Sequence, residues 1–209
     1  MKKLILIFTF ATLLASCADD DSKAGSKAKP ITVIIGGNTP VTFAYDDKDR
    51  LQSITQDGTV TTITYNAKNL AERITTGDNY YEFTYNNSGK FLSYKDQAGN
   101  VSQMLYISDN QYTINGIPLN LDPDNEVLKY SYASFEYNNL KGAFANVKHL
   151  NGFVLAIANS SAMYYGSRKR RNSLSNVGGT SAYTYVEGDN GLPASQTLQG
   201  TTTVFQYSE

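Results

Sequence analysis

The sequence is nearly devoid of the residue types that most catalytic and metal sites require. Its 209 residues contain one histidine, one cysteine and no tryptophan. A structural zinc site needs several Cys or His ligands, and a nucleophilic triad needs a base beside its Ser, Thr or Cys. The lone His149 lies in an apolar stretch, where we expect a structural role. We therefore expect a protein that is not an enzyme and that holds no metal and no cofactor.

Charge is also scarce. Charged residues make up 18% of the chain, and the formal net charge is −1. Nucleic-acid-binding domains carry strongly basic patches, so this balance argues against a nucleic-acid partner. A single cysteine cannot form an internal disulfide, so packing alone must stabilise the fold.

Oxygen-rich segments are the remaining candidates for metal or acid chemistry. Residues 122–126 (DPDNE) gather carboxylate and amide oxygens, but Val127 stands where a calcium-binding EF-hand loop needs glycine. We expect a polar turn there. Glycoside hydrolysis needs two carboxylates about 5–9.5 Å apart, and no motif selects such a pair among the 19 acidic residues. An enzyme with an unrecognised carboxylate site is accordingly the third and least favoured function.

The N-terminal residues have the pattern of an export signal. Lys2 and Lys3 precede an apolar run over residues 4–14, which is shorter than the roughly 20 residues needed to span a bilayer. The tetrad LASC, ending at Cys17, resembles the bacterial lipobox. The resemblance implies that residues 1–16 are a signal peptide that is cut off and that Cys17 carries the lipid. Several acyl chains would hold the protein firmly on a membrane.

An acidic cluster follows the cysteine. Asp19, Asp20 and Asp21 resemble the surface-export signal of lipoproteins from the phylum Bacteroidota. The resemblance implies an outer-membrane lipoprotein that faces the cell exterior; the alternatives are a solvated acidic linker and the periplasmic face. Residues 17–30 are small and charged, which is typical of a flexible tether. Residues 31–209 are expected to form a single domain.

Tyrosine is the compositional outlier, with 16 residues, and it is arranged periodically. Tyr45, Tyr65 and Tyr85 each end an apolar-x-tyrosine triplet, and they lie 20 residues apart. Degraded copies follow at Tyr106 and over 183–207. A fixed period indicates one supersecondary unit that is copied along the chain. Each unit has two alternating runs separated by Asp, Asn, Lys or Gly, which is typical of a β-hairpin.

The hairpin unit resembles the YD or RHS repeat. Tyr45-Asp46 followed by Arg50-Leu51 fits it best, whereas Tyr65-Asn66 and Tyr85-Asn86 replace Asp with Asn. Asp49 and Asn69 stand where that repeat has glycine, and both residue types tolerate a positive φ. Uncharacterised Bacteroidota surface lipoproteins combine such hairpins with a segment similar to residues 135–144. The resemblance implies a fold and a location but no activity.

These patterns predict an all-β domain with a minor α component. The hairpins chain into an antiparallel meander that forms a twisted sheet or a half-barrel. The segment at about 141–165 has near-helical apolar spacing, and we expect it to cover one face or end of the sheet. Asn115-Gly116 predicts a type I′ turn. Residues 166–182, which are rich in Gly, Ser and basic residues, predict an exposed loop.

A membrane-anchored, non-catalytic binding module for a glycan, a peptide or an outer-membrane protein partner is the function that the sequence favours. The binding candidates are six tyrosines and one basic run: Tyr80, Tyr81, Tyr130, Tyr132, Tyr164, Tyr165, Arg168, Lys169, Arg170 and Arg171. Tyrosines that face a sheet core and basic residues on a solvated loop are the structural alternatives. A carrier for a lipid or another apolar ligand in a curved sheet is the second function, and it requires a deep apolar pocket.

Overall fold

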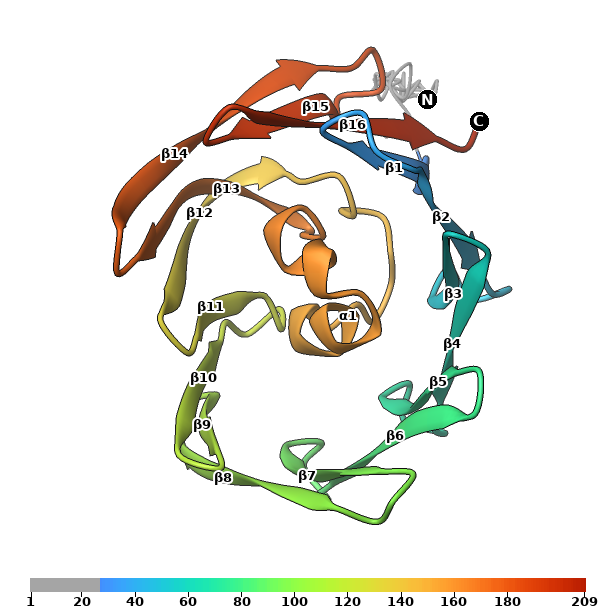
Figure 1. Cartoon of the computed structure of the whole chain (residues 1–209), viewed down its shortest axis with the longest axis vertical. Coiled ribbons are helices and arrows are strands. Elements are labelled where there is room, and N and C mark those ends of the chain that lie inside the picture. Colours follow the sequence, from blue (N-terminus) through green and yellow to red (C-terminus); the bar gives the residue numbers. More distant parts are fainter. Residues whose placement is uncertain (1–26) are drawn as a thin grey trace, which may run out of the picture.

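The computed structural model describes residues 27–209, which form a closed antiparallel barrel of sixteen strands (Figure 1). Each strand pairs with its neighbours in the sequence, and β1 (Pro30–Ile35) closes the ring by pairing with β16 (Thr201–Tyr207). The predicted all-β meander is confirmed. The sheet differs from a half-barrel because its two edges meet, which removes every unpaired edge. The predictions for residues 1–16, Cys17 and Asp19–Asp21 lie outside the described residues.

The remaining elements follow one another in chain order. The other strands are β2 (Val41–Tyr45), β3 (Leu51–Gln56), β4 (Thr59–Tyr65), β5 (Ala71–Thr76), β6 (Asn79–Tyr85), β7 (Phe91–Asp96), β8 (Val101–Ser108), β9 (Gln111–Ile114), β10 (Ile117–Leu121), β11 (Val127–Tyr130), β12 (Ala133–Lys141), β13 (Lys169–Asn176), β14 (Gly179–Glu187) and β15 (Pro193–Leu198). One α-helix, α1 (Gly152–Ala158), and one 3₁₀ helix, η2 (Ser160–Tyr164), lie between β12 and β13.

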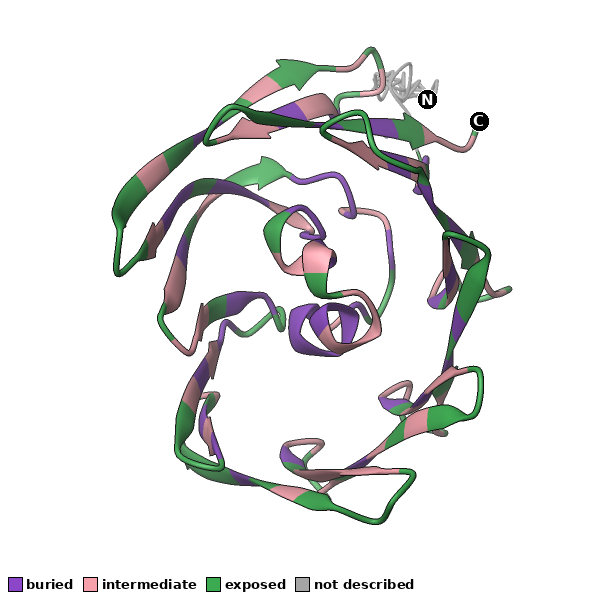
Figure 2. Cartoon of the chain, in the orientation of Figure 1, coloured by how far each residue is buried: buried purple, intermediate pink, exposed green. Residues whose placement is uncertain are grey.

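The tyrosine triplets place their first side chain in the core and their second in solvent. In β4, Ile63 is buried, Thr64 is exposed and Tyr65 is half-buried. The same sequence of burial recurs in β2, β14 and β16, as the period-2 geometry of a strand requires. Figure 2 shows the resulting alternation of buried and exposed segments around the ring.

The residue after each repeat tyrosine shapes a five-residue turn. Asp46 Oδ1 accepts hydrogen bonds from the backbone N–H groups of Lys48 and Arg50, at 3.0 and 2.9 Å. Asn66 and Asn86 repeat both bonds in the next two units. Asx side chains stabilise turns in this way, which explains why Asn substitutes for Asp in the repeat. The predicted positive φ is confirmed, with 61° at Asp49 and 60° at Asn69.

The repeat tyrosines themselves donate hydrogen bonds to the backbone of the preceding unit. The Tyr65 hydroxyl donates to the carbonyl oxygen of Leu51 at 2.8 Å, and Tyr85 donates to Ala71 at 2.7 Å. The same bond is made by four further tyrosines: Tyr45, Tyr137, Tyr185 and Tyr207. A half-buried hydroxyl needs such a partner. We call these six residues the tyrosine ladder.

The two ends of the barrel differ in their turns. One end, the Asx end, carries the five-residue turns that follow Tyr45, Tyr65 and Tyr85. The opposite end, the tight-turn end, carries two-residue turns such as Asn115-Gly116, with φ values of 50° and 84°. Positive φ at both residues confirms the predicted type I′ turn. β1 begins at Pro30 on the Asx end, where the Tyr45 hydroxyl reaches its carbonyl oxygen.

Residues 142–168 form a plug inside the barrel (Figure 1). The prediction that this segment covers one face of the sheet agrees with this position: the face is the inner surface of the barrel, and the apolar residues of the segment pack against it from within. Phe144 packs edge-on against Phe43 of β2, with ring centroids 5.3 Å apart. Phe153 of α1 packs against Phe91 of β7 at 6.0 Å. In the described part of the chain, no second layer of structure packs on the outside of the barrel. The apolar side chains of the strands therefore point inward and are buried against the plug.

The plug enters and leaves at the Asx end, through a close backbone crossing. The Gly142 N–H donates to the carbonyl oxygen of Arg168 at 2.8 Å. A Cβ at position 142 would stand 2.5 Å from the carbonyl oxygen of Ser167, so only glycine fits there. Asn151 caps α1 by accepting from the N–H groups of Phe153 and Val154.

The predicted exposed loop over 166–182 is wrong. Residues Lys169–Asn176 form β13, which pairs with β12 and β14. Only the short turn between β13 and β14 is a loop. The polar residues of β13 are typical of a solvated loop in the sequence, but several of their side chains are buried in ion pairs, as described below. Across residues 27–209, none of the helices has the length and hydrophobicity that a bilayer crossing requires.

Candidate functional site

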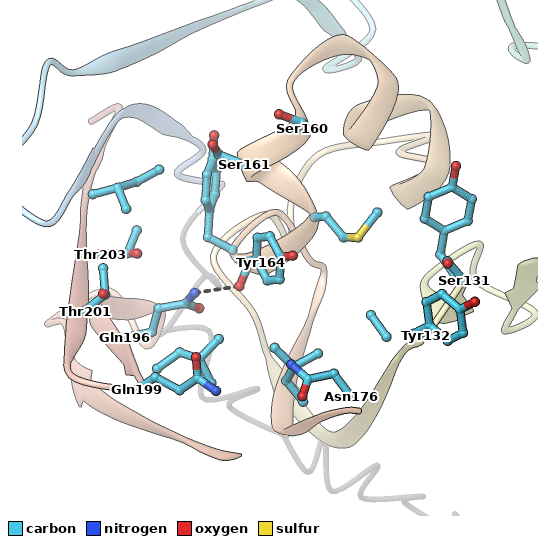
Figure 3. Close-up of a pocket in the computed structure, with 17 residues that line it drawn as sticks. Ser131, Tyr132, Ser160, Ser161, Tyr164, Asn176, Gln196, Gln199, Thr201 and Thr203 are labelled. Atoms are coloured by element: carbon cyan, nitrogen blue, oxygen red, sulfur yellow. Dashed lines mark hydrogen bonds between the residues drawn. The ribbon is translucent and has the colours of Figure 1, made fainter. Parts of the chain in front are cut away.

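A cavity of about 810 Å³ opens at the tight-turn end of the barrel (Figure 3). The ends of β1, β13, β15 and β16, together with the turn between β11 and β12, form its wall. The 3₁₀ helix η2 of the plug forms its floor. Its volume lies within the range of about 300–1,000 Å³ that is typical of small-molecule sites.

The lining of this cavity carries no charge and combines polar with apolar surface. It combines three side-chain amides, several hydroxyls, four tyrosines and a few apolar side chains: Ile35, Tyr130, Ser131, Tyr132, Ala133, Ser160, Ser161, Met163, Tyr164, Tyr165, Leu174, Asn176, Gln196, Leu198, Gln199, Thr201 and Thr203. No carboxylate, imidazole or amine lies among them. Neutral hydrogen bonds and ring contacts are therefore the interactions that the cavity offers to a ligand.

The floor of the cavity is fixed to the barrel wall. The carbonyl oxygen of Tyr164 accepts from the Tyr183 hydroxyl at 3.1 Å and from Gln196 Nε2 at 2.9 Å. At the other end of η2, Asn159 Nδ2 donates to Gln56 Oε1 at 2.8 Å. Because strands on both sides hold η2, the cavity has a set shape before any ligand enters.

The rim is formed by an exposed tyrosine and two amides. Tyr132 is 77% exposed and follows Ser131, whose φ is 54°. Figure 3 shows Tyr132 on the opposite side of the cavity from Gln196 and Gln199. Gln199 donates through Nε2 to the Ser181 hydroxyl at 2.8 Å, and Asn176 accepts through Oδ1 from the Gly178 N–H at 2.8 Å. Each anchored amide thereby turns its other polar atom toward a ligand.

One lining hydroxyl lacks a partner. Tyr165 is only 2% exposed, and its hydroxyl makes no hydrogen bond within residues 27–209. Burial raises the pKa of this phenol, so it stays a neutral donor. Buried hydroxyls are almost always hydrogen-bonded. The oxygen of this hydroxyl has almost no accessible surface, so Tyr165 lines the cavity through its other atoms.

Four of the six candidate tyrosines meet in this cavity. Tyr130, Tyr132, Tyr164 and Tyr165 all line it. The other two, Tyr80 and Tyr81, lie on β6 and do not reach it.

Tyr80 and Tyr81 have neighbours of their own. The guanidinium of Arg73 lies 3.8 Å from the Tyr80 ring centroid. Tyr81 packs edge-on against Tyr94, with ring centroids 5.9 Å apart. Neither ring is thus part of the site that the other four tyrosines share.

The basic run lies at the Asx end, where its residues make internal contacts. Lys169 Nζ pairs with Asp122 at 2.7 Å and with Asp124 at 2.6 Å. The hydrogen bonds that Lys169 donates to both carboxylates raise its pKa and keep it charged. Arg170 forms a two-point ion pair with Glu187, in which Nη2 and Oε2 are 2.7 Å apart.

Arg171 and Glu126 form the buried part of this network. Arg171 is 3% exposed, and its guanidinium lies 5.1 Å from the Phe135 ring centroid. Glu126 accepts from the Arg168 N–H at 2.6 Å and from the Ser167 hydroxyl at 3.0 Å. Burial raises the pKa of Glu126, and the charge of Arg171 opposes this rise. These contacts fasten the exit of the plug to β11 and β13.

Smaller cavities lie on either side of the plug. One of about 370 Å³ lies at the tight-turn end beside Gln56 and Asn159, and one of about 250 Å³ at the Asx end includes His149. Within residues 27–209, no group of three or more His, Cys, Asp or Glu side chains is placed to hold a metal ion. The large uncharged cavity is therefore the best-formed candidate site.

Sequence reasoning missed the amides of this site. Asn176 and Gln199 lie at turns, so the sequence pattern alone explains them as turn-forming residues. Gln196 faces inward, as Pro193 does three residues earlier, because a bulge at the start of β15 inserts one extra residue between Pro193 and Ser195. The repeat tyrosine Tyr207 fixes that strand by its bond to Pro193. The register of the repeat is the one signal that could have placed Gln196 inside.

Comparison with known proteins gives a distant structural likeness and no sequence match. No protein-family model matches the sequence, and no curated protein matches it. The barrel is similar to the crystal structure of a porin-like protein from Bacteroides uniformis, with a TM-score of 0.44 and 15% sequence identity. The match covers 87% of this chain and 95% of that chain. A likeness at this level transfers no functional property.

Proposed function

We propose that the protein is a non-catalytic binding module that is tethered to the outer membrane by lipid on Cys17 and faces the cell exterior. Its ligand occupies the uncharged cavity at the tight-turn end. The observation that carries this proposal is the cavity itself: it is preformed, lined by amides and tyrosines, and floored by a helix that both walls hold in place.

The outward face of the barrel supports a location in water. The middle residues of the repeat triplets face outward and are exposed, and most of them are threonine or glutamine: Thr64, Thr84, Thr184 and Gln206. Glu82 forms an ion pair with Lys95 at 2.9 Å on the same surface. A lipid-facing barrel carries an apolar band about 25 Å tall outside and polar residues inside, which is the reverse of this arrangement. Exposed apolar side chains also occur, for example Leu105 and Ile107 on β8, Leu92 on β7 and Val186 on β14.

The direction of β1 supports a cavity that points away from the membrane. β1 begins at Pro30 on the Asx end and finishes at Ile35, which lines the cavity. Strands rise about 3.3 Å per residue, so the two ends are separated by most of the barrel height. A tether at residues 17–30 therefore joins the end opposite to the cavity. This geometry presents the mouth of the cavity to the medium.

The plug counts against the alternative of a lipid carrier. Phe144, Phe153 and their neighbours fill the interior that an apolar ligand would need. What remains is a mouth lined by amides and hydroxyls, which would be left without partners beside a hydrocarbon chain. The proposal of a non-catalytic role is supported by the cavity lining, in which no Asp, Glu, His, Lys or Cys side chain is present to act as a general acid or base.

The test uses the mature chain carrying Cys17→Ser, so that no lipid obscures binding. Glycan arrays, a peptide library and a pull-down from outer-membrane extract are probed with this chain and with a Tyr132→Ala, Gln199→Ala double variant. We expect one class of ligand to bind the parent and not the double variant. Tyr80→Ala is the matched control, since Tyr80 lies outside the cavity. Absence of binding in all three assays, or binding that the double variant retains, would contradict the proposal.

A further inference from the structure

The chemistry of the cavity narrows the class of ligand, provided that the proposed binding function holds. We propose that the cavity binds the neutral end of a short oligosaccharide and excludes acidic glycans. Three features carry this inference: the absence of charge in the lining, the pairing of amides with hydroxyls, and the tyrosine rings at the rim and the floor.

The uncharged lining excludes uronic and sulfated sugars. A carboxylate or sulfate that enters the cavity loses water and finds no Arg, Lys or His among the lining residues. Moving an unpaired charge out of water is far more costly than moving a neutral hydroxyl that is hydrogen-bonded. The basic run cannot compensate, because Lys169 and Arg170 are engaged at the opposite end of the barrel.

The amides and hydroxyls match the donors and acceptors of a neutral sugar. A sugar hydroxyl both donates and accepts, and it needs partners that can do either. Gln196 Nε2 is committed to the Tyr164 carbonyl oxygen, so Gln196 presents Oε1 as an acceptor. Asn176 Oδ1 is committed to Gly178, so Asn176 presents Nδ2 as a donor.

The rings supply the apolar part of the site. Tyr132 is 77% exposed at the rim, and Tyr164 is 44% exposed on η2. Figure 3 shows Tyr164 between Tyr132 and the glutamines, so a sugar that reaches the amides lies against phenol rings. An aromatic face packs against the C–H face of a sugar and leaves its hydroxyls for polar groups. The cavity volume of about 810 Å³ gives space for more than one sugar ring.

A peptide ligand fits the site less well. Extended peptides commonly bind by adding a strand to an open sheet edge, and this barrel has none because β1 pairs with both β2 and β16. A peptide terminus would bring a charge for which the lining has no partner. The neutral end of a glycan needs no open sheet edge and brings no charge into the cavity, so it meets both conditions.

The experiment compares matched neutral and acidic oligosaccharides by isothermal titration calorimetry. The mature Cys17→Ser chain is titrated with oligomers of glucose, mannose, galactose and xylose, and with oligomers of glucuronate, galacturonate and sulfated galactose. We expect at least one neutral oligomer to bind and its acidic counterpart to bind at least tenfold more weakly. Equal or tighter binding of the acidic counterpart would overturn the inference.

Variants locate the binding. Tyr132→Ala and Gln196→Leu should each weaken binding of the neutral oligomer on the order of tenfold, whereas Gln206→Leu on the outer face should leave it unchanged. Thr201→Lys places one positive charge at the rim, and we expect it to raise the affinity for the acidic counterpart without loss of fold by circular dichroism. Binding that Gln206→Leu reduces as much as Gln196→Leu would overturn the inference.

The failure of this inference is distinguishable from the failure of the proposed function. A peptide or an acidic glycan that binds the parent chain and not Tyr132→Ala overturns the neutral-sugar inference and leaves the binding function standing. No binding of any glycan or peptide to the parent chain overturns both.

Discussion

The hydroxyl of Tyr65 donates a hydrogen bond to the carbonyl oxygen of Leu51, 14 residues earlier, at 2.8 Å. Tyr85, Tyr185 and Tyr207 each reach back by the same 14 residues. The bond joins the end of one strand to the start of an earlier one, beside the bulge that begins each five-residue turn. The regular spacing of the tyrosines in the sequence thus corresponds to a side-chain-to-backbone hydrogen bond that recurs along the barrel.

Removing the ladder hydroxyl of Tyr65 should destabilise the barrel measurably. Tyr65→Phe keeps the ring, which packs beneath the guanidinium of Arg50 at 4.4 Å, and leaves the Leu51 carbonyl without this donor. We expect a loss of about 1 kcal/mol in the free energy of unfolding, measured by urea denaturation. Tyr132→Phe is the control, because its hydroxyl is exposed. Equal stability of Tyr65→Phe and the parent would contradict a structural role for the ladder.

The first Asx turn should respond to pH in a way that its two Asn counterparts do not. Burial alone would raise the pKa of Asp46, but hydrogen bonds from Arg50 and Lys48 and the charge of Arg50 outweigh burial and lower it. A carboxyl whose folded pKa is lowered stabilises the fold above its unfolded value of about 4, and this stability disappears as the pH falls through the folded pKa.

Asp46→Asn isolates that contribution, since Asn66 and Asn86 make the same turn without charge. We expect the variant to be less stable than the parent at pH 7 and equally stable near pH 2, as measured by thermal unfolding across the pH range. A stability difference that stays constant from pH 7 to pH 2 would show that the charge of Asp46 is not the cause.

The plug should be part of the core and not a detachable cover. Phe153 is buried and contacts Phe91 and Tyr94 on β7 and Tyr130 on β11. Phe153→Ala should cost about 3–5 kcal/mol and lower the midpoint of a single cooperative transition. Leu105→Ala, on the exposed outer face, is the control and should change stability little. A second transition for the plug, separate from that of the barrel, would contradict this account.

The lipid should be the only attachment to the membrane. Cys17→Ser should move the protein from the membrane fraction to the soluble fraction of lysed cells and abolish incorporation of labelled fatty acid. The physical reason is that the middle residues of the repeat triplets are exposed and mostly polar, whereas a lipid-facing barrel has an apolar band on its outer surface. A Cys17→Ser chain that stays in the membrane pellet after a carbonate wash would indicate that the barrel itself is embedded.

Local features of the fold were predictable because they depend on neighbouring residues. The hairpins, the positive φ at Asp49 and Asn69, and the turn at Asn115 all follow from short patterns of side chains. Closure of the ring was not predictable in this way. It depends on pairs such as Val33 with Phe205, which lie at opposite ends of the chain and which no repeat period specifies.

The site was predictable only in part. Tyr132 and Tyr164 stood out as aromatic residues, but their position in one cavity depends on closure and on the plug lying inside. Arg170 and Arg171 resembled a solvated run because the sequence does not show that Glu187 and Glu126 lie beside them. The gathering of the tyrosines in one cavity and the pairing of the arginines both depend on contacts between residues far apart in the sequence. Short sequence patterns do not specify such contacts.

Protection of a thiol at the mouth of the cavity tests the central claim most directly. The Cys17→Ser chain has no other cysteine, so Thr201→Cys introduces a single thiol at the rim and Lys68→Cys a single thiol at the Asx end. The rate of labelling by a maleimide is measured with and without a saturating neutral oligosaccharide. We expect the sugar to slow labelling at position 201 and to leave the rate at position 68 unchanged. Unchanged labelling at position 201 with the sugar bound, or slower labelling at position 68 alone, would contradict a ligand site at the tight-turn end.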